Sequence, residues 1–458
     1  TPVTPVTPAT PATPATPVTP VTPVTPATPA TPATPVTPDT PVAPVKRTLP
    51  VLLILAAACG TEAVTPAGPI VRDSAGITIV ENPNRFALDT LSWQADTSAI
   101  LRIGVLEGNG PDVFGRIAGV ARLSDGRLAV ADATAHEIRF FAADGSFLSR
   151  AGRKGAGPGE YKYFSAMLKL PGDSLLIIDH EGGRLTVLSP QGAYVRSFRF
   201  QSKTGETPVS DAPSVRGVFG DGTFLVGHYL NACGEARMMG GVCQDSMRYT
   251  HDTQAGERLA DFGAHAYYRH ELIRLPSGRN YGFTDPHAQA FWSLHGERFF
   301  AADAARFEIR AFGRNGNLER IIRLAYEPVP MPASWRDPQL RAATTELERQ
   351  RNADIAEAYT RRTWPEHLPA FSSSTVDHSG NLWVREYAPR ISSVGPRWLV
   401  FDTTGALRYG VRLPALEIVP MFVSRWAGEI GDDYVLGVVR DSDGVESVWL
   451  VPLLKRGP

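Results

Sequence analysis

The feature that most constrains the fold is a hairpin unit that recurs along most of the chain. Its clearest copy spans Gly119–Tyr161, where Asp125-Gly126 and Asp144-Gly145 separate short β-rich runs. Asp-Gly between alternating hydrophobic runs is the strongest short-range hairpin signal. We therefore expect four antiparallel strands here, at residues 120–123, 127–131, 137–141 and 147–151.

Further units repeat this pattern of turn-paired strands, and the third contains a long interruption. The last unit has three strands, at residues 423–427, 433–439 and 446–452. Gly76–Asn82 can supply its fourth strand, and Leu101–Gly104 is a competing donor; such closure hides exposed sheet edges. Six four-stranded units of ~45 residues predict an all-β, six-bladed β-propeller, with a seventh blade at residues 87–104 as the alternative. The turns that mark units two to five are Gly172-Asp173, Gln191-Gly192, Asp221-Gly222, His295-Gly296, Asn315-Gly316, Ser379-Gly380 and Thr404-Gly405.

The first unit also carries a family resemblance. Its core, Asp-Gly-Arg-x-x-Val-Ala-Asp at residues 125–132, and its glycine-rich exit, Gly152–Tyr161, resemble the six-bladed, NHL-like β-propeller family. The resemblance covers roughly Gly76 to Leu454 and implies a propeller of the kind common among bacterial lipoproteins. That family includes scaffolds, lyases and lactonase-like enzymes, so the resemblance implies a fold and no particular activity.

Residues 1–44 form a Thr-Pro-rich repeat that cannot pack a core. Proline at every third position forbids a helix and removes donors from any sheet, so we expect an extended, disordered segment. A glycosylated stalk is one interpretation, and in-frame translation of an upstream tandem DNA repeat is the one we favour. If Val45 is a non-AUG start codon, the following signal begins there.

Residues 45–59 have the features of an export signal. Lys46 and Arg47 precede a short apolar run that ends in small residues before Cys59. This order of charge, apolar core and small-residue exit is typical of a secretory signal, and the run is about half as long as a membrane-spanning helix. Its end resembles a bacterial lipobox, which implies cleavage before Cys59 and lipid attachment to the Cys59 sulfur. Residues 60–75 then form a linker, and the propeller body is expected at residues 76–458.

Two cysteines remain once Cys59 is assigned to lipid. Cys233 and Cys243 lie in the interruption of the third unit, which we expect to be an exposed loop. In an exported protein a disulfide is their natural pairing. A metal site would need further ligands that the sequence does not identify.

A second interruption, Ala325–Pro369, separates the fourth and fifth units. Its stretch Asp337–Thr363 has helical composition, with a thin apolar stripe and many arginines. One interpretation is a helix that covers a face of the propeller. The other is a lid or partner-docking element, because long insertions on repeat proteins often mark the binding face.

Three aspartates follow the second strand of their units. Asp132, Asp179 and Asp303 occupy equivalent positions, and a ring of carboxylates could hold Ca²⁺. We favour the alternative that each aspartate caps its own turn through backbone hydrogen bonds.

Histidines His136, His180 and His228 occupy similar loops and would suit a transition metal if they converged, although chance scatter is the interpretation we favour. The glycine-rich Gly152–Tyr161 could cradle a phosphate, but no helix is expected after it, so we interpret it as a crossover loop.

These features predict a binding or scaffolding module at the bacterial cell envelope, anchored by lipid on the outer membrane or the periplasmic face of the inner membrane. With 46 basic and 47 acidic residues, the chain gives no electrostatic case for nucleic acid. We expect a monomer that binds a protein or small molecule on one propeller face, with no catalytic residue, metal ligand or cofactor assigned. The alternative is a lactonase-like hydrolase or lyase with a metal in the central channel.

Overall fold

The computed structural model describes residues 68–83, 93–203, 215–230, 233–234, 239–285, 290–333, 336, 345, 353–387, 397–414, 416, 418 and 428–455. All of them belong to one compact unit, Val64–Pro458. The Thr-Pro-rich repeat, the signal segment with Cys59 and the first part of the linker lie outside these residues. No helix in the described ranges is long and apolar enough to span a membrane.

The first two units fold as four-stranded antiparallel sheets, as the turn dipeptides predict. Gly126 and Gly145 have φ values of +89° and +86°, a backbone conformation that glycine adopts at little cost. A 3₁₀ turn, η2 (Pro171–Asp173), makes the first hairpin turn of the second sheet. The strands are β5 (Ile117–Arg122), β6 (Leu128–Asp132), β7 (Glu137–Phe141) and β8 (Phe147–Ala151), then β11 (Phe164–Lys169), β12 (Leu175–Asp179), β13 (Arg184–Leu188) and β14 (Tyr194–Phe198).

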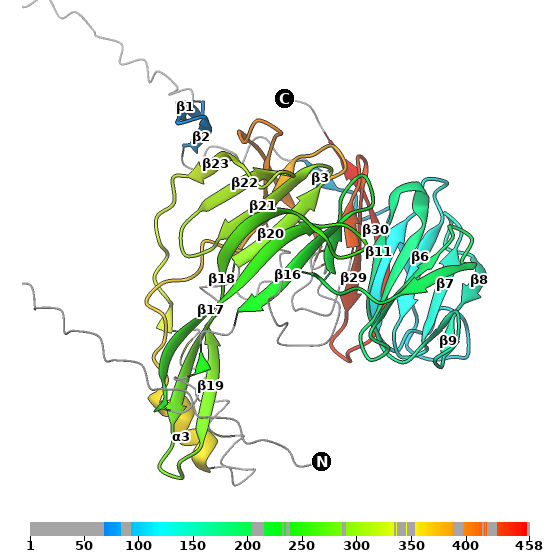
Figure 1. Cartoon of the computed structure of the whole chain (residues 1–458), viewed down its shortest axis with the longest axis horizontal. Helices are drawn as coiled ribbons and strands as arrows, with labels where there is room; N and C mark the ends of the chain where they lie inside the picture. Colours follow the sequence, from blue (N-terminus) through cyan, green and yellow to red (C-terminus); the bar gives the residue numbers. More distant parts are fainter. Residues whose placement is uncertain are drawn as a thin grey trace, which may run out of the picture. The chain divides into compact units, whose positions relative to one another are not determined.

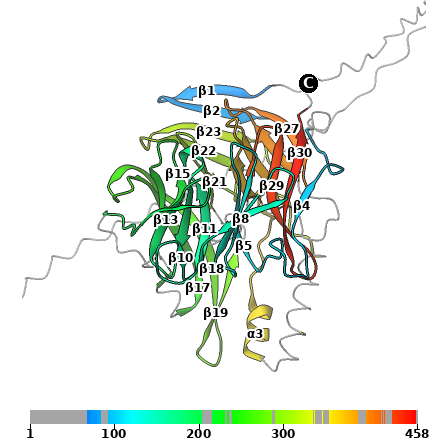
Figure 2. The same cartoon turned by 90° about the vertical axis from the view of Figure 1, so that its right-hand side faces the viewer.

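The third sheet departs from the expected pattern because two of its strands are far longer than the sequence indicated. Strands β17 and β18 have 12 and 17 residues, so much of the expected loop interruption is β-structure. They run beyond the ends of the neighbouring strands together with β19 (Figures 1 and 2). The sheet order is β15 (Val215–Val218), β16 (Phe224–Leu230), β17 (Gly241–Asp252), β18 (Arg258–Arg274) and β19 (Asn280–Asp285).

The fourth and fifth sheets follow the predicted turn pairs closely. Their connection contains helix α3 (Ala353–Arg361), and most of the remaining expected helical stretch lies outside the described residues. The strands are β20 (Ala290–His295), β21 (Arg298–Asp303), β22 (Glu308–Gly313) and β23 (Leu318–Leu324), then β24 (Phe371–Val376), β25 (Leu382–Glu386), β26 (Arg397–Phe401) and β27 (Leu407–Arg412).

The expectation that Gly76–Asn82 completes the last sheet is wrong. Strand β2 (Ile77–Asn82), with its hairpin partner β1 (Ile70–Ser74), instead pairs in parallel with β23 of the fourth sheet. The buried side chain of Asn82 fixes this position, since its amide donates to the carbonyls of Arg323 and Gly405, both at 3.0 Å, and its oxygen accepts from the Leu407 N–H at 2.7 Å. One residue thereby links the fourth and fifth sheets.

The competing donor, Leu101–Gly104, completes the last sheet instead. Strand β4 (Leu101–Ile103) pairs antiparallel with β30 (Glu446–Leu454), which pairs with β29 (Tyr434–Arg440) and then β28 (Gly428–Ile430). The expected first strand at residues 423–427 lies outside the described residues. Strand β3 (Gln94–Ala95) pairs with β27 and β30, so residues 93–103 extend existing sheets and form no sheet of their own.

Buried apolar clusters join each sheet to the next. Phe140 of the first sheet and Leu175 of the second lie in one cluster. Comparable clusters connect the second sheet to the third, and each later sheet to the next. The last sheet packs on the first through Leu436 and Val448 against Val120 and Val130. The described body is therefore an all-β, propeller-like arrangement in which the strand supplied by the N-terminal side ties the two ends of the repeat together.

Candidate functional site

The extended strands of the third sheet form a support for the insertion. Phe283 of β19 packs against Tyr359 of α3 with ring centroids 4.8 Å apart. Ile273, Leu275, Phe283 and Ala358 form a small core of their own. Helix α3 is therefore held against the extension, and Figures 1 and 2 show both at the same end of the molecule.

The two ends of the insertion run beside each other as they leave and rejoin the body. The Met331 N–H donates to the Glu366 carbonyl at 2.8 Å, and the Leu368 N–H donates to the Val329 carbonyl at 2.7 Å. The returning leg is fixed to the extension as well, because the Thr363 N–H donates to both carboxylate oxygens of Glu271, each at 3.0 Å. These bonds place the segment after α3 directly beside β18.

A cavity of about 460 Å³ lies between the extension and this returning leg. Its volume falls within the range typical of small-molecule sites. The lining is apolar on several sides and carries two arginines, an arrangement in which a few polar groups orient a mostly apolar ligand. The residues that define it here are Val242, Arg269, Glu271, Phe283, Arg362 and Trp364.

Arg362 is the distinctive group in this cavity. Its guanidinium carbon lies 4.9 Å from the centroid of the Phe283 ring and 4.4 Å from that of the Trp364 ring. Within the described residues it makes no hydrogen bond or ion pair, so its N–H donors are held in place by stacking alone. A stacked guanidinium with unused donors is suited to bind a carboxylate or phosphate through two parallel hydrogen bonds.

Two acids, Glu271 and Glu366, also line the cavity, but among the described residues neither forms an ion pair with Arg362. Glu271 accepts the two bonds from Thr363 described above. The cavity thus presents a positive group beside aromatic rings.

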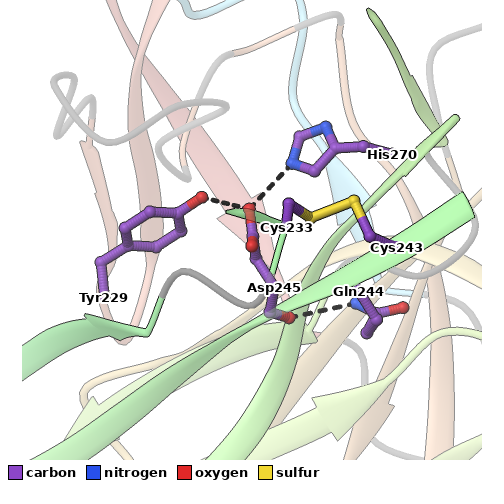
Figure 3. The surroundings of a disulfide bond; sticks show 6 residues. All are labelled: Tyr229, Cys233, Cys243, Gln244, Asp245 and His270. Carbon is purple, nitrogen blue, oxygen red and sulfur yellow. Dashed lines mark hydrogen bonds and ion pairs between the residues drawn. A yellow bond between two sulfur atoms is a disulfide. The ribbon is translucent and has the colours of Figure 1, made fainter. Parts of the chain in front are cut away.

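A second cluster surrounds the two cysteines, which the structure joins as a disulfide with a Cα–Cα distance of 5.4 Å (Figure 3). The expectation that both cysteines lie in an exposed loop is wrong, because Cys233 is buried and Cys243 lies within β17. Beside the disulfide, the fully buried Asp245 accepts hydrogen bonds from the Tyr229 hydroxyl and from His270 Nε2, the latter at 3.0 Å. Strands β16, β17 and β18 supply these side chains.

The three equivalent aspartates cap turns, as favoured from the sequence. Asp132 accepts the N–H groups of Gly115, Arg116, Thr134 and Ala135 at 3.0–3.3 Å. Asp179 accepts the N–H groups of Lys162, Tyr163 and Gly182, and Asp303 accepts that of Ala305. Arginines add ion pairs to each carboxylate, at 3.3 Å from Asp132 and at 3.4 Å from Asp179 and Asp303. These carboxylates hold their own loops and do not form a shared cation site.

The histidines singled out from the sequence do not converge. His180 is exposed, and His228 is buried with its Nε2 3.0 Å from the Thr250 hydroxyl. In the described ranges, the only group of three or more metal-ligating side chains with close donor atoms is Cys233, Asp245 and His270.

In the glycine-rich crossover Gly152–Tyr161, the carboxylate of Glu160 occupies the place where a phosphate would bind. Strands β9 (Arg153–Lys154) and β10 (Glu160–Tyr161) pair in parallel, and the Glu160 carboxylate accepts the N–H groups of Ala156 and Gly157 at 3.0 and 2.8 Å. Backbone hydrogen bonds from Gly157, with Arg153 beside them, hold the pKa of Glu160 below its usual range. The donors that would cradle a phosphate are therefore occupied.

A charged cluster links the inner strands of several sheets around Glu429 of β28. Its carboxylate accepts the Arg122 N–H at 3.0 Å and the Tyr434 hydroxyl at 2.8 Å, and lies 3.2 Å from Lys169 Nζ. Burial alone would raise the pKa of Glu429, but His378, Lys169 and these donors outweigh it and lower the pKa to about 2. Its oxygens are fully engaged, so this cluster ties strands together.

The Arg362 cavity was not identifiable from the sequence. The insertion was recognised as a possible binding element, but Phe283 and Arg362 are far apart in the chain and meet only through the β18–β19 extension. A clue exists in the close spacing of Arg362 and Trp364 after a helical stretch, although such a pair is common on exposed surfaces.

No protein-family model and no curated protein matches this sequence. Several solved structures are similar at low identity. An exported protein from Bacteroides fragilis is 12% identical over 82% of this chain and 100% of its own, with a TM-score of 0.43. A DUF4221-family member from Bacteroides vulgatus is 10% identical over 85% and 99%, with a TM-score of 0.37, and virginiamycin B lyase from Staphylococcus aureus is 8% identical over 73% and 94%, with a TM-score of 0.35. These likenesses assign neither a family nor an activity to this chain.

Proposed function

We propose that this protein is a lipid-anchored envelope module, a monomeric six-bladed propeller that binds an anionic ligand with an apolar body in the Arg362 cavity. The observation that carries the binding function is the Arg362 guanidinium, stacked on Phe283 and Trp364 with no anionic partner among the described residues. An arginine preorganised in this way loses little conformational freedom on binding. The cavity around it offers apolar surface for the rest of the ligand.

The strand pairing supports six blades, with the β1–β2 hairpin as an addition to the fourth. Each of the six hairpin units supplies three to five paired strands, β3 joins the last two units into one continuous sheet, and the last unit gains its fourth strand from β4. The buried clusters then connect consecutive sheets and return from the last sheet to the first. On this account the extension and the insertion project from a single face, since both leave the ring at the same end of its strands.

The ligand chemistry follows from the lining. A carboxylate is the group that matches the guanidinium, and an aromatic or aliphatic body matches Trp364, Phe283 and Val242. Both a small organic acid and the C-terminal residue of a peptide carry this combination. The ligand class is therefore an apolar carboxylate, and the two sources are separated by experiment.

Calorimetric titration of the full chain tests the proposal. We expect phenylacetate or a short peptide ending in phenylalanine to bind, and the matching amides, which have the same shape without the charge, to bind at least tenfold more weakly. Binding of phenylacetate alone identifies small acids as the source, and binding of the peptide alone identifies chain termini. Equal affinity of acids and amides, or no binding of any probe, refutes the proposed function.

Attachment to the membrane is supported by the signal-like segment that ends at Cys59. We expect Cys59→Ser to move the protein from the membrane fraction to the soluble fraction, because several acyl chains are needed for stable anchoring and the serine cannot accept them. Fractionation with Cys233→Ser as the control measures this. An unchanged membrane fraction for Cys59→Ser contradicts the lipid anchor.

A further inference from the structure

A cluster of side chains with metal-ligand chemistry lies beside the disulfide. One ligand atom from each of Cys233, Asp245 and His270 lies within 4.8 Å of the others. Cys243 Sγ is bonded to Cys233 Sγ, so a second sulfur adjoins this group. Figure 3 shows the disulfide beside the hydrogen-bonded Asp245 and His270 side chains. We propose that reduction of this disulfide creates a binding site for a thiol-seeking divalent cation such as Zn²⁺.

The donor set matches that cation. Two thiolates, one carboxylate and one imidazole are ligands that Zn²⁺ takes in four-coordinate sites, with donors roughly 3 to 4 Å apart around the metal. Thiolate ligands favour Zn²⁺ over Ca²⁺ or Mg²⁺, which prefer oxygen. The sequence alone did not identify further ligands for the two cysteines. The fold places Asp245 and His270 beside them.

The surroundings hold these donors in place. Cys243 and Asp245 lie on β17, and His270 lies directly across from Cys243 on β18. The Tyr229 hydroxyl donates to the Asp245 carboxylate and so orients it from outside the cluster. Outer partners of this kind typically raise metal affinity about 10- to 100-fold. His270 is partly exposed at 21% of its side chain, which leaves a route for the ion.

A dithiol can serve as the reductant of the Cys233–Cys243 disulfide. The dithiol supplies two electrons and two protons, its sulfurs join as a disulfide, and the Cys233–Cys243 bond breaks to give two thiols. Metal binding then displaces the two thiol protons to solvent. In the reverse direction a small-molecule disulfide takes the two electrons from the thiolates and is itself reduced to a dithiol, which releases the ion and restores the Cys233–Cys243 bond.

Cobalt binding to the full chain tests this site. The Cys59→Ser chain is reduced with dithiothreitol, freed of reductant under anaerobic conditions and titrated with Co²⁺, which reports thiolate ligation by a sulfur-to-cobalt charge-transfer band. We expect one Co²⁺ per reduced chain and at least a hundredfold weaker binding to the oxidised chain. His270→Ala and Asp245→Asn should each weaken binding at least tenfold, and Tyr229→Phe about tenfold. Replacing His180, an exposed histidine in the turn after β12, by alanine (His180→Ala) should leave Co²⁺ binding unchanged.

The thermal midpoint gives an independent readout if reduction loosens the third sheet. Ions that bind only the folded chain raise its midpoint, so Co²⁺ should raise that of the reduced chain and leave that of the oxidised chain unchanged. Absence of both the charge-transfer band and this rise overturns the proposal, as does equal binding by His270→Ala. Neither result bears on ligand binding at Arg362.

Discussion

Arg362→Ala is expected to weaken phenylacetate binding by about 100-fold, equivalent to ~2.7 kcal/mol, because hydrogen bonds to charged groups contribute about 1.5–3 kcal/mol. The substitution removes the paired donors and leaves Phe283 and Trp364 as apolar surface. The phenylacetate affinity of Arg362→Lys should lie between those of the native chain and Arg362→Ala, since an ammonium group keeps the charge but cannot form a planar bidentate pair. Calorimetric titration of the same ligand measures each affinity.

Arg361→Ala is the matched control for this result. Arg361 is the neighbouring residue, but it ends α3 and pairs with Glu357 on the same helix, away from the cavity lining. We expect its ligand affinity to stay within about twofold of the native chain, because surface pairs of this kind contribute little. Equal loss in both variants would show that charge near the insertion matters in general and would contradict a site centred on Arg362.

Gly104→Ala is expected to lower the free energy of unfolding by about 3 kcal/mol or more. Gly104 follows β4 with a φ of +138°, and an added Cβ would lie 2.8 Å from the Cα of Ser447 in β30. The left-handed backbone costs about 1–2 kcal/mol for alanine, and displacing the backbone of the closing strand adds to it. Guanidinium chloride unfolding measures the change.

Gly76→Ala separates these two contributions. Gly76 has a φ of +81° in the β1–β2 turn, but no atom lies within 4 Å of an added Cβ. It should therefore show only the backbone cost, about 1 kcal/mol. If both variants lower the free energy of unfolding by the same amount, the packing of β4 against β30 does not stabilise the fold in the way that the strand pairing indicates.

The local part of the fold was predictable because turn chemistry fixes it. Asp125-Gly126 and Asp144-Gly145 placed the strands of the first sheet, and β7 and β8 match the expected residues 137–141 and 147–151. The closing strand was not decided by such signals, since Gly76–Asn82 and Leu101–Gly104 are both β-rich. In the structure, Asn82 anchors β2 at the fourth sheet, because its buried amide bonds to backbone groups of the fourth and fifth sheets.

The candidate sites were less accessible to sequence reasoning. The capping role of Asp132 and Asp179 could be predicted because aspartate recurs at the equivalent position of several units. A single functional site would not need the same residue in each unit. The length of β17 and β18 was missed because the segment between Met247 and Arg274 alternates weakly and contains glycine and histidine. The Arg362 cavity and the ligands around Cys233 both depend on that extension, so neither could be placed without it.

The position of the bound ligand tests the central claim most directly. A phenylacetate derivative that carries a photoreactive diazirine on its ring can be crosslinked to the full chain, and the modified peptides identified by mass spectrometry. We expect modification at residues 362–369 and 269–283, competed by unlabelled phenylacetate and absent in Arg362→Ala. Competed crosslinks confined to other parts of the chain would contradict a binding site at Arg362.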